Sequence, residues 1–283
     1  MEEEIPILET ITGEHLERRL NFFFPILFEL LDDNKLDWNT VANKFDNKIK
    51  EYKAKHEKLK TTFEIQVSFF TLISSALNGA EDGRRLLGFI QKMFEELIEL
   101  LDKNEKRLIV SNIYGILTNI NSDYLNFIGE LLALRHFKQS LPFQLIGTEV
   151  PLYPENPSGT KIDFQFLNTV TKKIELIEIV NVRLDDGNIS NDELIDRIIH
   201  QKLKEKLLKK KISKTNRFNL VPVLWGQWDK IRVMEKYYVD RQLTINNITT
   251  PICFVPFTDQ QGNPVYRTGT IDTMFTNTKV EFP

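Results

Sequence analysis

The chain has 283 residues, of which 41% are hydrophobic and 11% aromatic, and its formal net charge is −3 at pH 7. This composition predicts a globular protein with apolar cores. The near-neutral charge excludes a global attraction to nucleic acid or to a membrane, so any basic surface must be local. The single cysteine, Cys253, excludes an internal disulfide framework and a multi-cysteine zinc site, and the four histidines lack metal-ligand spacing.

The amino terminus reads "MEEEIPILET", which is acidic and lacks the basic start and long apolar run of a secretory signal. No apolar stretch of the sequence approaches the length needed to span a membrane. Together with the single cysteine, these features predict a cytoplasmic protein with no membrane contact.

Helical patterns dominate the first part of the chain. Only Pro6 and Pro25 of the 11 prolines precede residue 142, which favours helices first and a sheet afterwards. We expect residues 1–120 to form a helical domain that serves in partner binding, dimerisation or target recognition. Amphipathic patterns predict helices over residues 13–31, 36–77, 84–103 and 121–140.

From residue 141 the pattern changes to short apolar runs that are separated by turns. The order of these runs predicts an α/β or α+β domain over residues 121–283, with a mixed sheet flanked by helices. A long basic helix is predicted within residues 185–211, before the last of these strands. The predicted strands cover residues 143–153, 160–167, 174–182 and 218–226.

One predicted strand carries a carboxylate among aliphatic residues. In "KIELIEIVNVR", residues 173–183, a period of two puts Glu178 on the same face as Leu176 and Val180. Both faces are largely apolar, which predicts a central strand in a covered sheet. A buried carboxylate normally survives only when it is paired, hydrogen-bonded or bound to a metal, so Glu178 is the first candidate functional residue.

A second carboxylate, Asp163, lies 178 − 163 = 15 positions upstream on the preceding predicted strand. A hairpin between the two strands brings both carboxylates to one end of adjacent strands. Two carboxylates and a neighbouring backbone carbonyl can hold a divalent cation, and water on that cation can attack a phosphodiester. The pattern predicts a metal site for Mg²⁺ or Mn²⁺ that is formed by Asp163 and Glu178.

The layout resembles the PD-(D/E)xK nuclease superfamily, the restriction-endonuclease-like fold. Glu130 in "FIGELLALRHF" matches its helical glutamate, Asp163 in "SGTKIDFQF" its hairpin aspartate, and Glu178 in "ELIEIVN" its strand acid. The resemblance covers residues 121 to about 228 and leaves the first 120 residues unexplained. It implies a Mg²⁺- or Mn²⁺-dependent hydrolase of nucleic acid, with DNA favoured and with these three acids at the catalytic centre.

The sequence departs from the E-x-K motif of that superfamily, because Val180 stands where the lysine is expected. Some members carry this cation on the following helix instead. In "RIIHQKLKEK", Lys202 continues the apolar stripe of Ile195 and Ile199 at i, i+4 and i+7, so Lys202 is the candidate catalytic cation. Two further candidates on this helix rank behind it: Gln201 and Lys206.

The same helix carries a strong local charge. Residues 197–217 hold nine Lys or Arg against one acid, Glu205, which gives 9 − 1 = +8. Beside a metal site such a helix can guide a phosphate backbone, although it also suits a solvated helix face or an acidic partner. Trp225 and Trp228, near the end of the last predicted strand, either stack on bases or pack under the sheet.

Each candidate also has a purely structural reading. Glu130 is then a solvated helix residue, Asp163 lies on the polar side of an edge strand, and Glu178 pairs with an internal cation such as Arg197. Lys202 is then one of many solvated lysines. Two other functions therefore stay open: a catalytically inactive nuclease-like fold that binds DNA or a protein, and a helical interaction protein whose α/β half is a docking scaffold.

Overall fold

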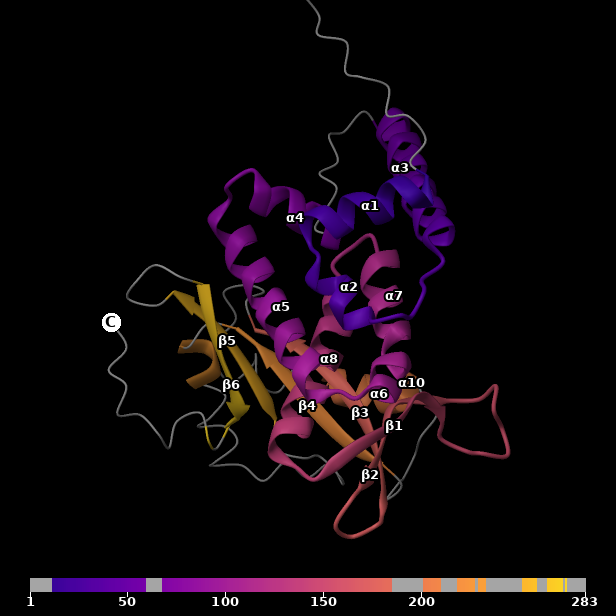
Figure 1. The fold of residues 1–283 in the computed structure, drawn as a ribbon, viewed down its shortest axis with the longest axis vertical. Helices are drawn as coiled ribbons and strands as arrows, with labels where there is room; N and C mark the ends of the chain where they lie inside the picture. Colours follow the sequence, from indigo (N-terminus) through magenta and orange to yellow (C-terminus); the bar gives the residue numbers. More distant parts are fainter. Residues whose placement is uncertain are drawn as a thin grey trace, which may run out of the picture.

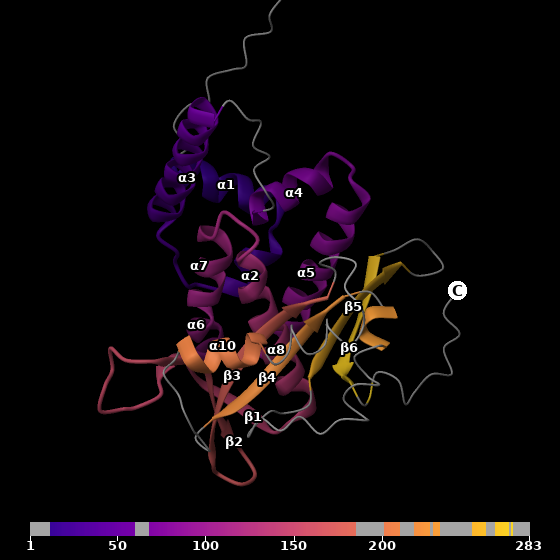
Figure 2. The ribbon, with the colours of Figure 1, turned by 180° about the vertical axis from the view of Figure 1, so that it is seen from behind.

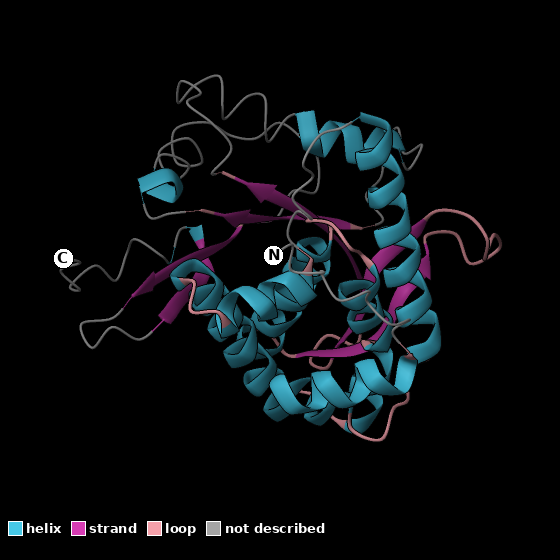
Figure 3. Cartoon of the chain, turned by 90° about the horizontal axis from the view of Figure 1, so that it is seen from above, coloured by secondary structure: helices cyan, strands magenta, loops and turns pink. Residues whose placement is uncertain are grey.

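A layer of helices covers one face of an open six-stranded sheet (Figure 1). The structure is a computed structural model, and it describes residues 12–59, 68–184, 201–209, 218–226, 229–232, 251–258, 264–271 and 273. Seen from above, the helices overlie the strands (Figure 3). The mixed α/β class that the sequence predicts is confirmed.

The predicted helical first half is confirmed, but its helices are shorter and more numerous than expected. The range 13–31 is split before Pro25, which has no N–H to continue the first helix. None of the helices in the described ranges is both long and apolar enough to cross a membrane. The helices are α1 (Gly13–Phe23), α2 (Ile26–Leu31), α3 (Trp38–Leu59), α4 (Phe69–Leu77), α5 (Glu81–Leu100), α6 (Lys103–Leu108), α7 (Val110–Thr118) and α8 (Tyr124–Ser140).

The helices α6 and α7 were not predicted from the sequence. A capping box starts α6, because the Asp102 carboxylate accepts from the backbone N–H of Glu105 at 2.9 Å, and the Glu105 carboxylate accepts from the N–H of Asp102 at 3.1 Å. The predicted helix over residues 84–103 runs into this capping box and does not extend to the rest of α6. The Glu105 carboxylate is buried, and it also pairs with Lys138 and accepts from the N–H of Leu145, so it ties α6 to α8 and to the first strand.

The sheet runs in the order β1-β2-β3-β4-β5-β6. Neighbouring strands are antiparallel except at β3–β4 and β4–β5, which are parallel. The helix α10 (Gln201–Lys209) lies between β3 and β4 in the chain, as a parallel connection requires. The strands are β1 (Phe143–Pro151), β2 (Lys161–Asn168), β3 (Ile174–Arg183), β4 (Asn219–Trp225), β5 (Ile252–Thr258) and β6 (Pro264–Thr270), of which β5 and β6 were not predicted.

The central strand β3 is covered on both faces, as the sequence predicts. Ile177 and Ile179 face the helical layer and belong to its apolar cluster. Val180 and Val182 face the other way and pack in a second cluster with Leu203 of α10. Viewed from behind, α10 therefore crosses the face of the sheet that the other helices leave open (Figure 2).

The helices of the first half and the sheet share one buried apolar cluster. Phe89 of α5 packs against Phe254 of β5 and Tyr266 of β6, with ring centroids 3.9 and 4.5 Å apart. The cluster extends from α1 through α8 to β5. The boundary at residue 120 between a helical and an α/β domain stays a prediction.

A close contact between α8 and β3 fixes the helix over the sheet. The Asn181 side chain donates to the backbone carbonyl of Asn126 at 3.0 Å and accepts from Trp225 Nε1 at 2.9 Å. It lies directly against Gly129 of α8, where a Cβ atom would overlap the Asn181 side-chain oxygen. Trp225 itself is buried against the helical cluster, which confirms that it packs under the sheet, whereas Trp228 lies outside the described residues.

Gly129→Ala is therefore expected to destabilise the fold by about 1–3 kcal/mol or more, because the new methyl group must displace either α8 or Asn181. Asn181→Ala removes the obstruction. In a double-mutant cycle followed by chemical denaturation, the cost of Gly129→Ala should thus be smaller in the Asn181→Ala background. Additive costs would contradict the proposed steric conflict.

Candidate active site

Asp163 and Glu178 meet where regular pairing between β2 and β3 stops. The paired positions end at Phe164 and Ile177, and the two acids are the next residues on their strands. Beyond that point, hydrogen bonds to side chains replace the backbone hydrogen bonds between the two strands. Asp163 Oδ2 accepts from the N–H of Ile179 at 2.7 Å, and Glu178 Oε2 accepts from the N–H of Asp163 at 3.3 Å. Each carboxylate is thus held by the backbone of the neighbouring strand.

Both carboxylates are removed from solvent. Glu178 is fully buried and Asp163 is 7% exposed. Because β2 lies between β1 and β3, the alternative that placed Asp163 on the polar side of an edge strand is wrong. A buried pair of acids needs a cation or several hydrogen-bond donors.

Lys206 of α10 supplies that cation. Its Nζ lies 2.8 Å from Glu178 Oε1 and 3.6 Å from Asp163 Oδ2, and it donates to the backbone carbonyl of Ile179 at 2.7 Å. Burial alone would lower the pKa of Lys206, but the charges of Asp163 and Glu178 and the hydrogen bond with Glu178 outweigh it and raise the pKa above its usual value. The ammonium group is therefore charged at neutral pH.

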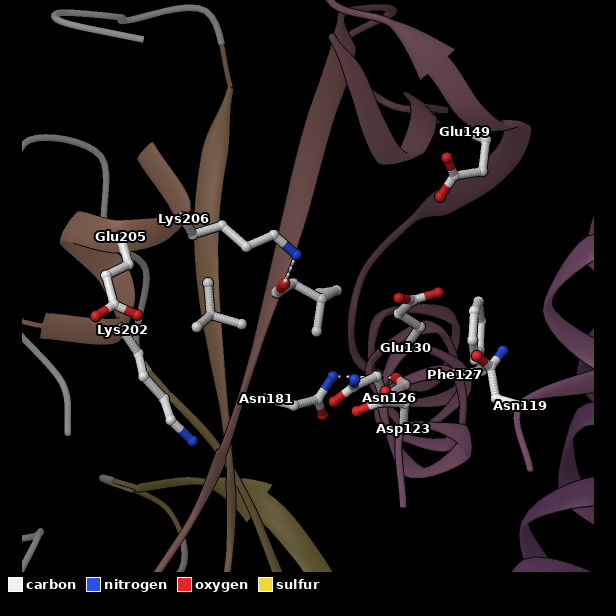
Figure 4. Close-up of a pocket in the computed structure, with 12 residues that line it drawn as sticks. Asn119, Asp123, Asn126, Phe127, Glu130, Glu149, Asn181, Lys202, Glu205 and Lys206 are labelled. Carbon is white, nitrogen blue, oxygen red and sulfur yellow. Dashed lines mark hydrogen bonds between the residues drawn. The ribbon is translucent and has the colours of Figure 1, made fainter. Parts of the chain in front are cut away.

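Lys202 lies one helical turn before Lys206 on α10. It is exposed and lines the same pocket (Figure 4). Leu203 is buried and so fixes which side of α10 faces the sheet. Lys206, three positions later, lies on that same side. The contact with the two acids that was expected of Lys202 is made by Lys206, and the catalytic role assigned to Lys202 stays a prediction. Three residues of the sequence argument lie outside the described residues: Ile195 and Ile199, which form the stripe with Lys202, and Arg197, the alternative partner of Glu178.

Glu130 reaches the site from α8. It is only 8% exposed, so the alternative of a solvated helix residue is wrong. Its Oε2 accepts from Asn112 Nδ2 of α7 at 2.7 Å. Burial, followed by the charge of Asp163, raises the pKa of Glu130 well above its usual value. Lys206 opposes this effect, and Glu149 and Glu178 add to it.

Glu149 is a fourth acid, which the sequence analysis did not identify. The register of β1 and β2 pairs Thr148 with Phe164 and Val150 with Ile162, which places Glu149 opposite Asp163. Its φ of 50° lies in the left-handed region that favours glycine. The only sign of Glu149 in the sequence is a carboxylate inside a predicted strand. Its positive φ arises from the tertiary fold and leaves no local pattern.

Glu130, Glu149 and Lys206 line a pocket of about 580 Å³ between α8 and α10. Glu130 and Glu149 face into it from one side and Lys206 from the other (Figure 4). Ile179 and Val180 of β3 form its floor. Pockets of about 300–1,000 Å³ are typical of sites for small ligands.

The site can be tested against the cation that the sequence predicts. Asp163, Glu178 and the carbonyl of Ile179 present oxygen atoms around one point, which Lys206 Nζ now contacts. Within the described ranges, no group of three or more His, Cys, Asp or Glu side chains is placed to hold a metal. Two carboxylates and a carbonyl nevertheless suit Mg²⁺, which keeps several water ligands.

Comparisons with known proteins give no relative. No protein-family model matches the chain, and neither a curated protein nor a solved structure matches it significantly.

The raised pKa of Glu130 makes stability depend on pH in a defined direction. The folded state holds this proton to higher pH than the unfolded state, so stability is lost as pH rises from the unfolded toward the folded pKa. Glu130→Gln cannot ionise and can still accept from Asn112. The melting temperature of the variant should therefore match that of the wild type near pH 4 and exceed it near pH 8.

The matched control is Glu17→Gln on the exposed side of α1, which should leave the pH profile of the melting temperature unchanged. A Glu130→Gln protein that is less stable than the wild type at pH 8 would show that the ionised form is the one the fold prefers.

Proposed function

We propose that this protein is a metal-dependent phosphodiester hydrolase of nucleic acid, of the PD-(D/E)xK type, with DNA as the favoured substrate. The proposal rests chiefly on one observation. Asp163 and Glu178, two buried acids on adjacent strands, share the ammonium group of Lys206 in the wall of a pocket. Ionisable groups so deeply buried in a cleft are typical of functional sites.

The topology supports the same assignment. The order α8-β1-β2-β3-α10-β4 corresponds to the helix, hairpin, acid-bearing strand, helix and strand of that superfamily. The helix before β1 carries Glu130, and the strand that bears Glu178 is parallel to β4.

In this proposal Asp163, Glu178 and the carbonyl of Ile179 hold Mg²⁺ or Mn²⁺, which when bound supplies an activated water and polarises the phosphate. Lys206 stabilises the negative charge that develops on the phosphate. Glu130 assists by orienting water on the pocket side of the two acids.

Lys206 also explains how the site can have Val180 at the position of the usual lysine, because Lys206 supplies the positive charge from α10. Val180 and Glu178 share one face of β3, and α10 packs across that face. A long side chain from α10 therefore approaches Glu178 from the side on which a lysine at position 180 would lie. Its ammonium group makes the 2.8 Å contact with Glu178 Oε1.

The competing function is a catalytically inactive, nuclease-like module that binds DNA or a protein. It is favoured by the ion pairs of Lys206, which satisfy Asp163 and Glu178 inside the protein. A buried pair of this kind can serve structure alone. Metal binding and cleavage separate the two functions.

The decisive experiment is cleavage of single-stranded DNA, double-stranded DNA and RNA by the purified protein with Mg²⁺ or Mn²⁺. We expect cutting that stops when the metal is chelated. Asp163→Asn should reduce the rate by about 100-fold or more, because the exchange removes a charged metal ligand. Absence of cutting by folded protein on all three substrates would favour the inactive module.

A comparison of two lysines one turn apart tests which of them is catalytic. Lys206→Ala should lower the cleavage rate by about 100-fold or more, since it removes the cation beside Glu178. Lys202→Ala removes a pocket lysine from the same helix and should lower the rate less than Lys206→Ala does. Calorimetric titration with Mg²⁺ should show that Lys206→Ala still binds the metal. A larger loss of rate in Lys202→Ala would give the catalytic role to Lys202.

A further inference from the structure

The pocket continues beyond Glu130 and Glu149 to a wall formed by α8 and the segment before it. This wall carries Asn119, Asp123, Asn126 and Phe127. Its chemistry differs from that of the acidic end, because it offers amide groups that both donate and accept and one aromatic ring. Figure 4 shows these side chains grouped beside Glu130 and across the pocket from α10.

Phe127 is a supported aromatic surface. A Cβ atom at Gly115 of α7 would lie only 2.5 Å from the nearest ring atom, so the ring rests against a backbone that has no side chain there. The ring is half-buried, packs against the helical cluster and lines the pocket. A ring held in this way suits stacking, because its orientation is already fixed before a ligand arrives.

The polar groups beside the ring are also held in place. The backbone carbonyl of Asn126 accepts from Asn181, which fixes the start of α8 while the Asn126 side chain lines the pocket. Asn119 donates to the carbonyl of Gly115 at 2.7 Å, which leaves its side-chain oxygen as an acceptor. The Asp123 carboxylate accepts from Asn121 at 2.8 Å. Amide and carboxylate groups next to an aromatic ring match the polar edge and the flat face of a nucleobase.

The opposite wall carries two positively charged side chains and one acid. Lys202, Glu205 and Lys206 of α10 line it, and the two lysines can contact a phosphate group. The distribution of the lining residues therefore separates a base end at α8 from a phosphate end near Asp163 and Glu178. A base inside a duplex is stacked on both sides, so it can contact Phe127 only after it has left the stack.

We propose that the α8 wall of the pocket binds one unpaired nucleobase next to the phosphate to be cleaved, so that the substrate is single-stranded or locally unpaired nucleic acid. This inference rests on the proposed function, because that function places the phosphate between the lysines and the acids.

The test is a binding measurement that does not need cleavage. Fluorescence anisotropy of labelled oligonucleotides is recorded with the full chain, once with EDTA and once with Mg²⁺. A single strand should bind more tightly than a blunt duplex of the same length. It should also bind more tightly than an abasic strand, which has the same phosphates but no bases. Equal affinity for the three ligands, or no binding to any of them, would overturn the proposal.

Two variants locate the base in the pocket. Phe127→Leu keeps an apolar side chain against Gly115 but removes the ring, and it should weaken single-strand binding by roughly tenfold. Asn126→Ala should also weaken it. The matched controls lie away from the pocket: Phe22→Leu, whose side chain is 78% exposed on α1, and Asn104→Ala on the exposed side of α6. Both controls should bind as the wild type does.

Further outcomes separate failure of the base site from failure of the proposed hydrolase. Unchanged binding in both pocket variants would overturn the base site, and metal-dependent cleavage by the same proteins would then leave the proposed hydrolase standing. Deoxynucleoside monophosphates are the second ligand. If they bind as tightly as the strand and lose affinity in Phe127→Leu, the base site is supported and its ligand is a single nucleotide. A melting temperature equal to that of the wild type excludes misfolding of the variants.

Discussion

Two negative charges lie inside the sheet, and the arrangement around them depends on how they are stabilised. Glu178 is fully buried and Asp163 nearly so, and each accepts a backbone N–H from the strand opposite. Lys206 then joins both carboxylates to the Ile179 carbonyl. Leaving a buried charge without its partner costs on the order of 3–5 kcal/mol, so α10 is held to β3 by charge as well as by Leu203. Lys206 therefore contributes both to the packing of α10 on β3 and to the chemistry of the site.

The acids around Asp163 and Glu178 are held by a helix and a strand of the fold. Glu130 projects from α8, which Asn181 and Gly129 fix over β3. Glu149 comes from β1 at a point where the backbone leaves the normal strand conformation. Such irregular strand positions occur preferentially beside functional sites, where they redirect a side chain. The result is a concentration of acids on a framework that cannot easily relax away from them.

Much of this site could be predicted from the sequence, because a buried strand has aliphatic residues on both faces and a carboxylate among them is conspicuous. Aliphatic residues on both sides of Glu178 identify a central strand, and the structure has β3 between β2 and β4. The sequence predicts the acids Glu130, Asp163 and Glu178, and the structure brings all three together.

The remainder depends on tertiary contacts that no local pattern records. The choice between Lys202 and Lys206 depends on the rotation of α10, which Leu203 fixes by packing on Val180 and Val182. Glu149 enters the site because the register of β1 and β2 places it opposite Asp163, at a position where its backbone has a positive φ. The short helix α6 did leave a signal, the capping box of Asp102 and Glu105, but the predicted helix over residues 84–103 runs past the end of α5 and into this box.

The position of the cation on a helix also constrains how this sequence can change. Because Lys206 occupies the space beside Glu178, residue 180 is free to be apolar, and Val180 now completes the cluster beneath α10. A lysine at position 180 would remove that packing and bring a second positive charge toward the first. The two placements of the lysine compete for the same space, so a lysine introduced at position 180 while Lys206 is present would give a less stable protein.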